Sequence, residues 1–227
     1  MAERRAMSEQ QALLSLAQSS VVGASDFREL ASPDTTLQSG LLGLLACWCA
    51  ATQLGVTEDP EGSNDGPMVG QYWRTHGADK PGAWCAYFCS WAWKSAIRMA
   101  NTCLATHDLD ARYMLTSDTS GSTARWWHKR SPLSSWTAAE IRSGRMRPVR
   151  GDVLIRNDKP DEVHRGERGS GGHIVLVTGY GEGRAWTIEG NSRSGSWDNN
   201  GGSVVAKSID IDDPRVVGIC RIQARLR

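Results

Sequence analysis

The sequence predicts an α+β fold in which helices form the first half of the domain and an antiparallel sheet forms the second half. Stretches with helical periodicity precede residue 151, whereas short β-branched runs separated by Gly or Pro turns follow it. Elements segregated in this way are typical of α+β domains. The 227 residues suit one domain with a short addition, so we divide the chain into an N-terminal extension of undefined role, residues 1–36, and a domain, residues 37–227.

The helical half begins with one helix expected in the extension, from Ser8 to Ser19. The apolar run from Leu37 to Leu54 predicts a buried helix that is stopped by Gly55. The other expected helices are Met68 to His76, Trp84 to Met99, Thr123 to Arg130 and Thr137 to Ser143.

Five strands are expected after Gly151, because each run is short and apolar and is bounded by turn residues. They are Val153 to Arg156, His173 to Thr178, Ala185 to Glu189, Ser203 to Ala206 and Val216 to Ile222. The segment Asn157 to Gly172 is charged and rich in Gly, and it is expected to be a loop.

Composition and hydropathy exclude several classes of function. The net charge of +1 does not indicate nucleic acid as a partner. The apolar run from Leu41 to Ala51 is too short to cross a membrane, so no membrane insertion is expected. The first twenty residues lack the apolar core of a secretory signal, and the six cysteines lack a disulfide-framework spacing. We therefore expect synthesis in the cytoplasm, with mostly reduced thiols.

Cys85 is the first candidate for chemistry, because it follows the turn at Pro81 and Gly82 and opens a predicted helix. Unpaired backbone N–H groups and the positive end of the helix dipole favour a thiolate at that position. The alternative is that Cys85 belongs to a small apolar stripe of the helix, as we expect for Cys89 one turn further on.

His173, Glu189 and Asn191 form the second group of candidates. His173 starts an apolar strand after two glycines, which predicts an exposed position at the strand end. Glu189 and Asn191 end the next strand and share one of its faces, because side chains alternate. A hairpin register with paired numbers summing to 362 places His173 opposite Glu189, and a sum of 364 places it opposite Asn191. Thiol, imidazole and acid or amide together suit a nucleophile, a base and an orienting group.

Four sequence blocks resemble the CHAP-type cysteine amidohydrolases and peptidases, a branch of the papain-like superfamily that includes the NlpC-type wall hydrolases. The blocks are Pro81-Gly82-Ala83-Trp84-Cys85-Ala86-Tyr87-Phe88, Arg150-Gly151-Asp152-Val153-Leu154, Gly172-His173-Ile174-Val175-Leu176-Val177 and Ile188-Glu189-Gly190-Asn191. They occur in the family's order, and the similarity extends from about Leu41 to Ile222. The resemblance implies a papain-like fold with the catalytic set Cys85, His173, Glu189 and Asn191.

The resemblance also implies a function, namely thiol-dependent hydrolysis of an amide bond in bacterial peptidoglycan, as an amidase or as a stem-peptide endopeptidase. With no signal peptide, delivery to the cell wall by a phage lysis system or by injection as an antibacterial effector is expected. An effector would have an immunity protein as its partner. Two alternatives remain open: an amidase that acts on a soluble amide, and a non-catalytic wall-binding or structural module of the same fold.

Neither a metal nor a cofactor is expected. Cys85, Cys89 and His173 lack a fourth zinc ligand at a recognisable spacing. We interpret the acidic segment as a solvated loop rather than a calcium site; its members are Glu58, Asp59, Glu61 and Asp65. Gln71 and Tyr72 are possible oxyanion donors, although ordinary helix positions are the simpler interpretation.

Overall fold

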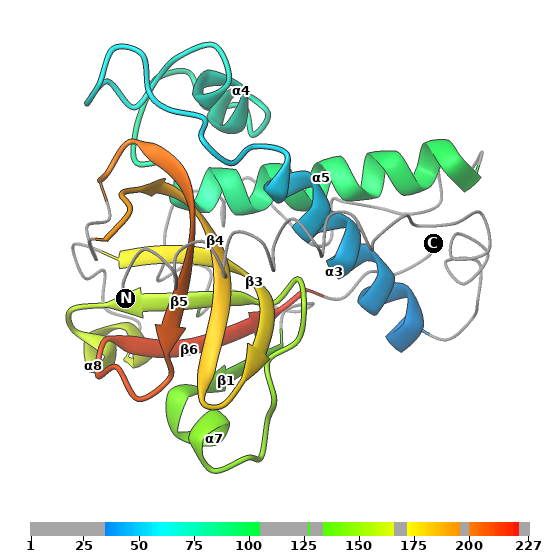
Figure 1. Ribbon diagram of the computed structural model, residues 1–227, viewed down its shortest axis with the longest axis vertical. Coiled ribbons are helices and arrows are strands. Elements are labelled where there is room, and N and C mark those ends of the chain that lie inside the picture. Colours follow the sequence, from blue (N-terminus) through cyan, green and yellow to red (C-terminus); the bar gives the residue numbers. More distant parts are fainter. Residues whose placement is uncertain (1–34, 105–126, 128–133, 166–171, 196–199, 223–227) are drawn as a thin grey trace, which may run out of the picture.

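The computed structural model of the protein describes residues 35–104, 127, 134–165, 172–195 and 200–222, and these form an α+β arrangement (Figure 1). The α+β expectation is therefore confirmed at the level of its architecture, a six-stranded antiparallel sheet with several helices. The helix expected from Ser8 to Ser19, and all but one residue of that expected from Thr123 to Arg130, lie outside the described residues.

The strands follow the order β1-β6-β2-β3-β4-β5 across the sheet. Their bounds are β1 Ser134–Thr137, β2 Val153–Asn157, β3 Gly172–Gly181, β4 Arg184–Ser192, β5 Ser203–Asp210 and β6 Val216–Arg221. All five expected strands are present. Strand β1 was not expected, because its sequence, Ser-Ser-Trp-Thr, has no apolar alternation; it pairs with β6 through tertiary contact.

The helices agree with expectation in position more than in length. Their bounds are α3 Thr35–Ala51, α4 Val69–Arg74, α5 Cys85–Leu104, α7 Ala138–Arg142 and α8 Pro160–His164. A capping box between Thr137 and Glu140 starts α7. Helix α8 shows that the loop expected from Asn157 to Gly172 is wrong in part. Pro160 at the start and two acids in the first turn suit a short helix, although the segment has no apolar periodicity.

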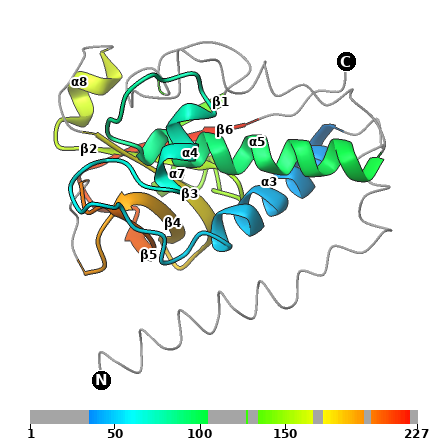
Figure 2. The same cartoon turned by 90° about the horizontal axis from the view of Figure 1, so that it is seen from above.

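Helices α3 and α5 lie beside each other and pack against the sheet, as both views show (Figures 1 and 2). Ile174, Leu176 and Ile188 belong to the core that these helices share with the sheet. Alternate residues of the same strands, such as Val175 and Val177, join a second core together with α7. In the described part of the chain, no helix has both the length and the apolar character needed to span a bilayer.

Gly190 allows α5 to approach β4 closely. A Cβ atom added at Gly190 would lie 2.6 Å from Phe88 Cβ and 2.7 Å from Trp84 Cζ3. Trp84 immediately precedes α5 and Phe88 lies in its first turn, and both are fully buried. The short distance between helix and strand, which brings the first turn of α5 to the end of β4, therefore depends on the missing side chain at this position.

Asp152, in the block that opens β2, has a structural role. It is buried, and both carboxylate oxygens accept hydrogen bonds of 2.9 Å from the Arg221 guanidinium at the end of β6. Its Oδ2 also accepts a bond from the backbone N–H of Val149. This bidentate pair joins the beginning of β2 to its neighbour in the sheet.

Candidate active site

Cys85 is the first residue of α5, as its position after the Pro-Gly turn predicts. The first backbone bond of the helix runs from the Phe88 N–H to the Trp84 carbonyl, so the amides of residues 85 to 87 have no partner within the helix. The five cysteines of the described residues are free thiols, and Cys85 is 6% exposed. The sulfur therefore lies at the positive end of a helix, in a nearly dry environment.

Trp84, immediately before Cys85, is held in place by an acid from the preceding loop. Its indole Nε1 donates a 2.8 Å hydrogen bond to Glu58 Oε1, and Glu58 Oε2 accepts a second bond of 2.8 Å from the Gly62 N–H. The interpretation of this acidic segment as solvated is wrong for Glu58, which is buried, although Asp59 and Glu61 are exposed. A carboxylate can enter this environment because both oxygens have donors.

We expect Glu58→Ala to destabilise the protein by about 1–3 kcal/mol, because it leaves the buried indole N–H of Trp84 without an acceptor. Urea unfolding measures this loss. Glu61→Ala is the matched control, since Glu61 lies in the same loop and its one described ion pair, with Arg193, is exposed. Equal stability of the two variants would contradict the assigned role of Glu58.

His173 and Glu189 contact each other inside the protein. His173 Nε2 lies 3.1 Å from Glu189 Oε2, and both side chains are fully buried. The expectation of an exposed His173 is therefore wrong: although it is near the start of β3, neighbouring strands and α5 cover it. Because an ionised carboxylate only accepts hydrogen bonds, Nε2 carries the proton, and Nδ1 is the nitrogen left for Cys85.

At the end of the β3–β4 pairing nearest the site, the register is one of the two considered from the sequence, since Leu176 pairs with Ile188 and Val177 with Thr187 and these numbers sum to 364. A bulge between Val177 and Gly179, which was not expected, changes the sum to 365 toward the turn. The described pairing starts at Leu176, and β4 departs from regular pairing between Glu189 and Ser192. His173 thus lies beyond the pairing of β3 with β4, where Glu189 reaches it diagonally.

Asn191 lies within this irregular part of β4, with a φ of +55°. Its side chain is buried, and its amide Nδ2 donates a 3.4 Å hydrogen bond to Asn200 Oδ1. The described contact of the imidazole is with Glu189. Of the two candidates for orienting His173, the geometry therefore favours Glu189.

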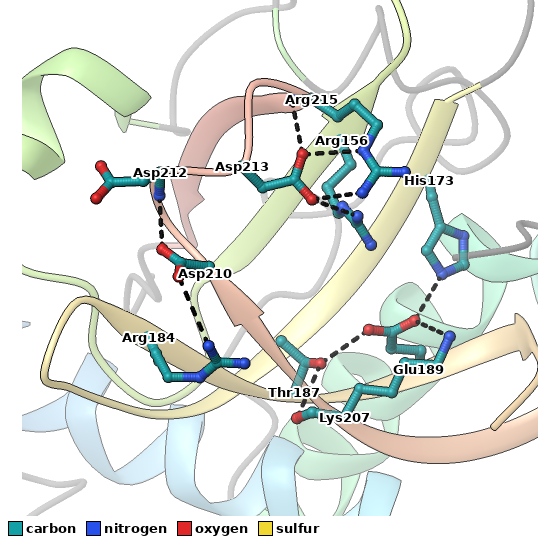
Figure 3. A network of polar contacts seen from close by, with 10 residues as sticks. All are labelled: Arg156, His173, Arg184, Thr187, Glu189, Lys207, Asp210, Asp212, Asp213 and Arg215. Carbon is teal, nitrogen blue, oxygen red and sulfur yellow. Dashed lines mark hydrogen bonds and ion pairs between the residues drawn. The ribbon is translucent and has the colours of Figure 1, made fainter. Parts of the chain in front are cut away.

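Glu189 is surrounded by donors from β4 and β5 (Figure 3). Thr187 Oγ1 donates to Glu189 Oε1 at 2.9 Å, and Ser192 Oγ donates to Oε2 at 3.0 Å. Lys207 Nζ lies 3.4 Å from Oε2 and donates a 2.6 Å hydrogen bond to Ser192 Oγ. With burial opposing ionisation, the His173 imidazolium, Lys207 and Thr187 together lower the pKa of Glu189 to about 2.

The thiol and the imidazole stabilise each other's charged forms. Burial raises the pKa of Cys85, but the polar interaction with the His173 ring and the positive charge of that ring, together with the backbone N–H groups of Ile174 and Ala86, bring the pKa below its ordinary value. Burial likewise lowers the pKa of His173, and its interactions with Cys85 and Glu189 overcome this effect and raise it to about 9. The site therefore favours a thiolate–imidazolium pair.

The geometry nonetheless includes no regular hydrogen bond between the thiol and the imidazole. His173 Nδ1 is buried and has no hydrogen-bond partner among the described residues. This arrangement is compatible with catalysis, because hydrogen bonds of unliganded catalytic sites are often long and tighten when substrate binds.

Two other expectations concern neighbouring residues. Cys89 is fully buried, and burial raises the pKa of its thiol, as expected for a core residue. Tyr72 is unsuited to be an oxyanion donor, because its hydroxyl is buried and donates to Gln53 Oε1 at 2.9 Å. Gln71 is exposed on α4. The backbone N–H of Cys85, which α5 leaves without an internal partner, is the better donor.

A second polar network lies next to His173. Arg156 pairs with His173 across β2 and β3, and it is 5% exposed. Its Nη2 donates to Asp213 Oδ2 at 2.9 Å, and Arg215 donates to both oxygens of the same carboxylate (Figure 3). Asp213 therefore offsets only part of the positive charge that the two arginines bring near the imidazole, since one carboxylate is shared by two guanidinium groups.

Sequence reasoning missed the residues that support the site from a distance along the chain. Thr187 and Ser192 had a usable signal, since they flank Glu189 at i−2 and i+3 on the same strand. Lys207 and Glu58 had none. Lys207 reaches Glu189 because β5 pairs with β4, placing Lys207 opposite Thr187. Glu58 reaches Trp84 because the loop after α3 folds back onto α5.

A scan against family models finds no match for the chain, and searches of curated proteins and of solved structures find no match either. The chemistry of the site is therefore inferred from its residues. A thiol at a helix N-terminus, an imidazole that stabilises its anion and a buried acid on the opposite ring nitrogen suit covalent acyl transfer.

Proposed function

We propose that the protein is a cysteine hydrolase of the CHAP type that cleaves an amide bond in bacterial peptidoglycan. The observation that carries the proposal is the buried contact of His173 with Glu189 at the point where Cys85 begins α5. A papain-like fold is part of the proposal. A long helix that begins at the nucleophile and packs on an antiparallel sheet bearing the base supports it.

The reaction would begin when the Cys85 thiolate attacks the amide carbonyl carbon and forms an S–C bond. The negative charge then passes to the carbonyl oxygen, close to the backbone N–H at the start of α5. His173, protonated on Nδ1, gives this proton to the departing nitrogen as the C–N bond breaks, leaving a thioester on Cys85.

Water completes the cycle. His173 takes a proton from water as the oxygen attacks the thioester, and the sulfur departs as thiolate when the C–S bond breaks. The carboxylic acid product leaves, and the thiolate–imidazolium pair is restored. Throughout, Glu189 holds the Nε2–H side of the ring, so that Nδ1 stays directed to the reacting atoms.

Peptidoglycan as the substrate rests on the four sequence blocks, since the residues of the site define only thiol-dependent amide cleavage. We further propose that the protein reaches the wall through phage lysis or as an injected effector. In the effector case a neighbouring gene would encode an immunity protein that binds this chain. Co-purification of the two gene products tests this point, and the absence of any protective neighbour would contradict the effector route.

Digestion of purified sacculi tests the function. Wild-type protein and Cys85→Ala are incubated with sacculi, and the soluble muropeptides are identified by mass spectrometry. We expect products from the wild type alone; free stem peptides indicate an amidase, and cleaved stems an endopeptidase. A wild type that releases nothing but binds sacculi would support a wall-binding module, and equal release by Cys85→Ala would rule out the proposed nucleophile.

A further inference from the structure

The buried cluster contains a second cation besides His173. Lys207 comes from β5, its side chain is 14% exposed, and its Nζ lies 3.4 Å from Glu189 Oε2. The same oxygen receives His173 Nε2 at 3.1 Å and Ser192 Oγ at 3.0 Å. Lys207 also donates to Ser192 Oγ, so it is anchored at a fixed distance from the carboxylate.

The position of Lys207 matters because the cluster is almost completely shielded from solvent. A thiolate, an imidazolium and a carboxylate carry a net charge of −1, and an uncompensated charge in a buried site is unfavourable. An ammonium group at the far side of Glu189 brings the net charge of the four groups to zero. Lys207 also competes with His173 for Oε2, which limits how strongly Glu189 can hold the imidazolium.

We propose that Lys207 is a positioning residue that neutralises the buried Cys85–His173–Glu189 set and thereby determines the pH range in which the thiolate–imidazolium pair exists. This inference rests on the proposed function, because it concerns the reactive state of Cys85. Lys207 acts on the thiol through Glu189 and Ser192.

The other charged groups around the cluster do not replace Lys207. Arg156 faces His173 from β2, but its guanidinium is bound to Asp213, which also binds Arg215. Cys89 approaches from α5, and burial keeps its thiol neutral by raising its pKa. Among the described residues, Lys207 is the cation other than His173 that contacts Glu189.

The sign of the expected effect follows from charge alone. Removing a nearby positive charge makes every neighbouring group hold its proton more firmly, so the pKa values of Cys85, His173 and Glu189 all rise. In Lys207→Met, the pH at which Cys85 becomes reactive and the alkaline limit of hydrolysis should both move upward, by about half a pH unit or more. If Lys207 had a purely structural role, its removal would lower the rates of alkylation and hydrolysis without shifting either of these two pH values.

Alkylation of Cys85 by iodoacetamide as a function of pH, followed on the Cys85 peptide by mass spectrometry, measures the pH at which the thiol becomes reactive. The pH profile of muropeptide release measures the alkaline limit of hydrolysis. Lys207→Arg keeps the charge and should retain both wild-type values. Lys159→Met is the control for charge loss at the surface, because the Lys159 side chain is 64% exposed. Lys207→Gln replaces the Met variant if the latter does not fold.

The outcomes separate the two proposals. If Cys85 of the wild type shows the alkylation profile of an ordinary thiol, the proposed function fails, and this inference with it. If Cys85 of the wild type is activated as proposed, but neither uncharged variant shifts the pH dependence of alkylation or of hydrolysis, only the role of Lys207 is overturned. Failure of both uncharged variants to fold, with a folded and active Lys207→Arg, would assign the charge to stability and would likewise overturn the inference.

Discussion

Glu189→Gln is expected to reduce amide hydrolysis on the order of 10⁴-fold, the loss typical of converting the acid beside a catalytic histidine to its amide. The introduced carboxamide would be neutral and could present either a donor or an acceptor to Nε2, so the ring would lose its fixed orientation. The imidazolium would also lose its counter-charge. The pKa of His173, about 9 in the native protein, should therefore fall.

The pH profile distinguishes this role from a general loss of structure. In the proposed mechanism the imidazolium is the proton donor to the leaving nitrogen. The alkaline limit of the Glu189→Gln variant should therefore move to lower pH, opposite to the shift expected for Lys207→Met. Thermal melting establishes that the variant is folded. Glu162→Gln, which changes a surface acid paired with Lys159, is the control and should retain wild-type activity. Activity within tenfold of wild type in Glu189→Gln would exclude Glu189 as the orienting group.

Gly190→Ala is expected to have the largest effect among substitutions that change no charge. The new methyl group would lie 2.6–2.7 Å from Phe88 and Trp84, closer than carbon atoms approach without repulsion. To avoid this clash, α5 must move away from β4. Overpacking of this kind typically reduces the free energy of unfolding by up to about 3 kcal/mol. Cys85 lies between these two aromatic residues in the chain, so the proposed nucleophile would move with the helix.

A displacement of this kind should reduce hydrolysis by about 10²-fold even in the folded fraction, because small misplacements of reacting groups have large effects on rate. Urea unfolding and muropeptide release measure the two losses. Gly40→Ala, at an exposed position of α3 with no atom near the added Cβ, is the control. It should be neutral or stabilising. A Gly190→Ala protein as stable as Gly40→Ala would show that the close approach of helix and strand is not required.

Local sequence signals were sufficient where an element's own residues define it. The turn at Pro81 and Gly82 placed the start of a helix within one residue of Cys85, and β-branched runs located five of the six strands. Hairpin geometry placed Glu189 within reach of His173. The bulge at Asn191 was not predicted, because a single asparagine in the left-handed region leaves no pattern in a strand.

By itself, the sequence determined the helix–sheet architecture and the candidate groups Cys85, His173 and Glu189, since periodicity, turns and alternation act over a few residues. Only the tertiary structure decided that His173 is buried, that Glu189 rather than Asn191 contacts it, and that Glu58 and Lys207 support the site. These features depend on pairing and burial between segments far apart in the chain. The ionisation of a thiol and an imidazole depends on how such segments exclude water and place charges, which no local pattern specifies.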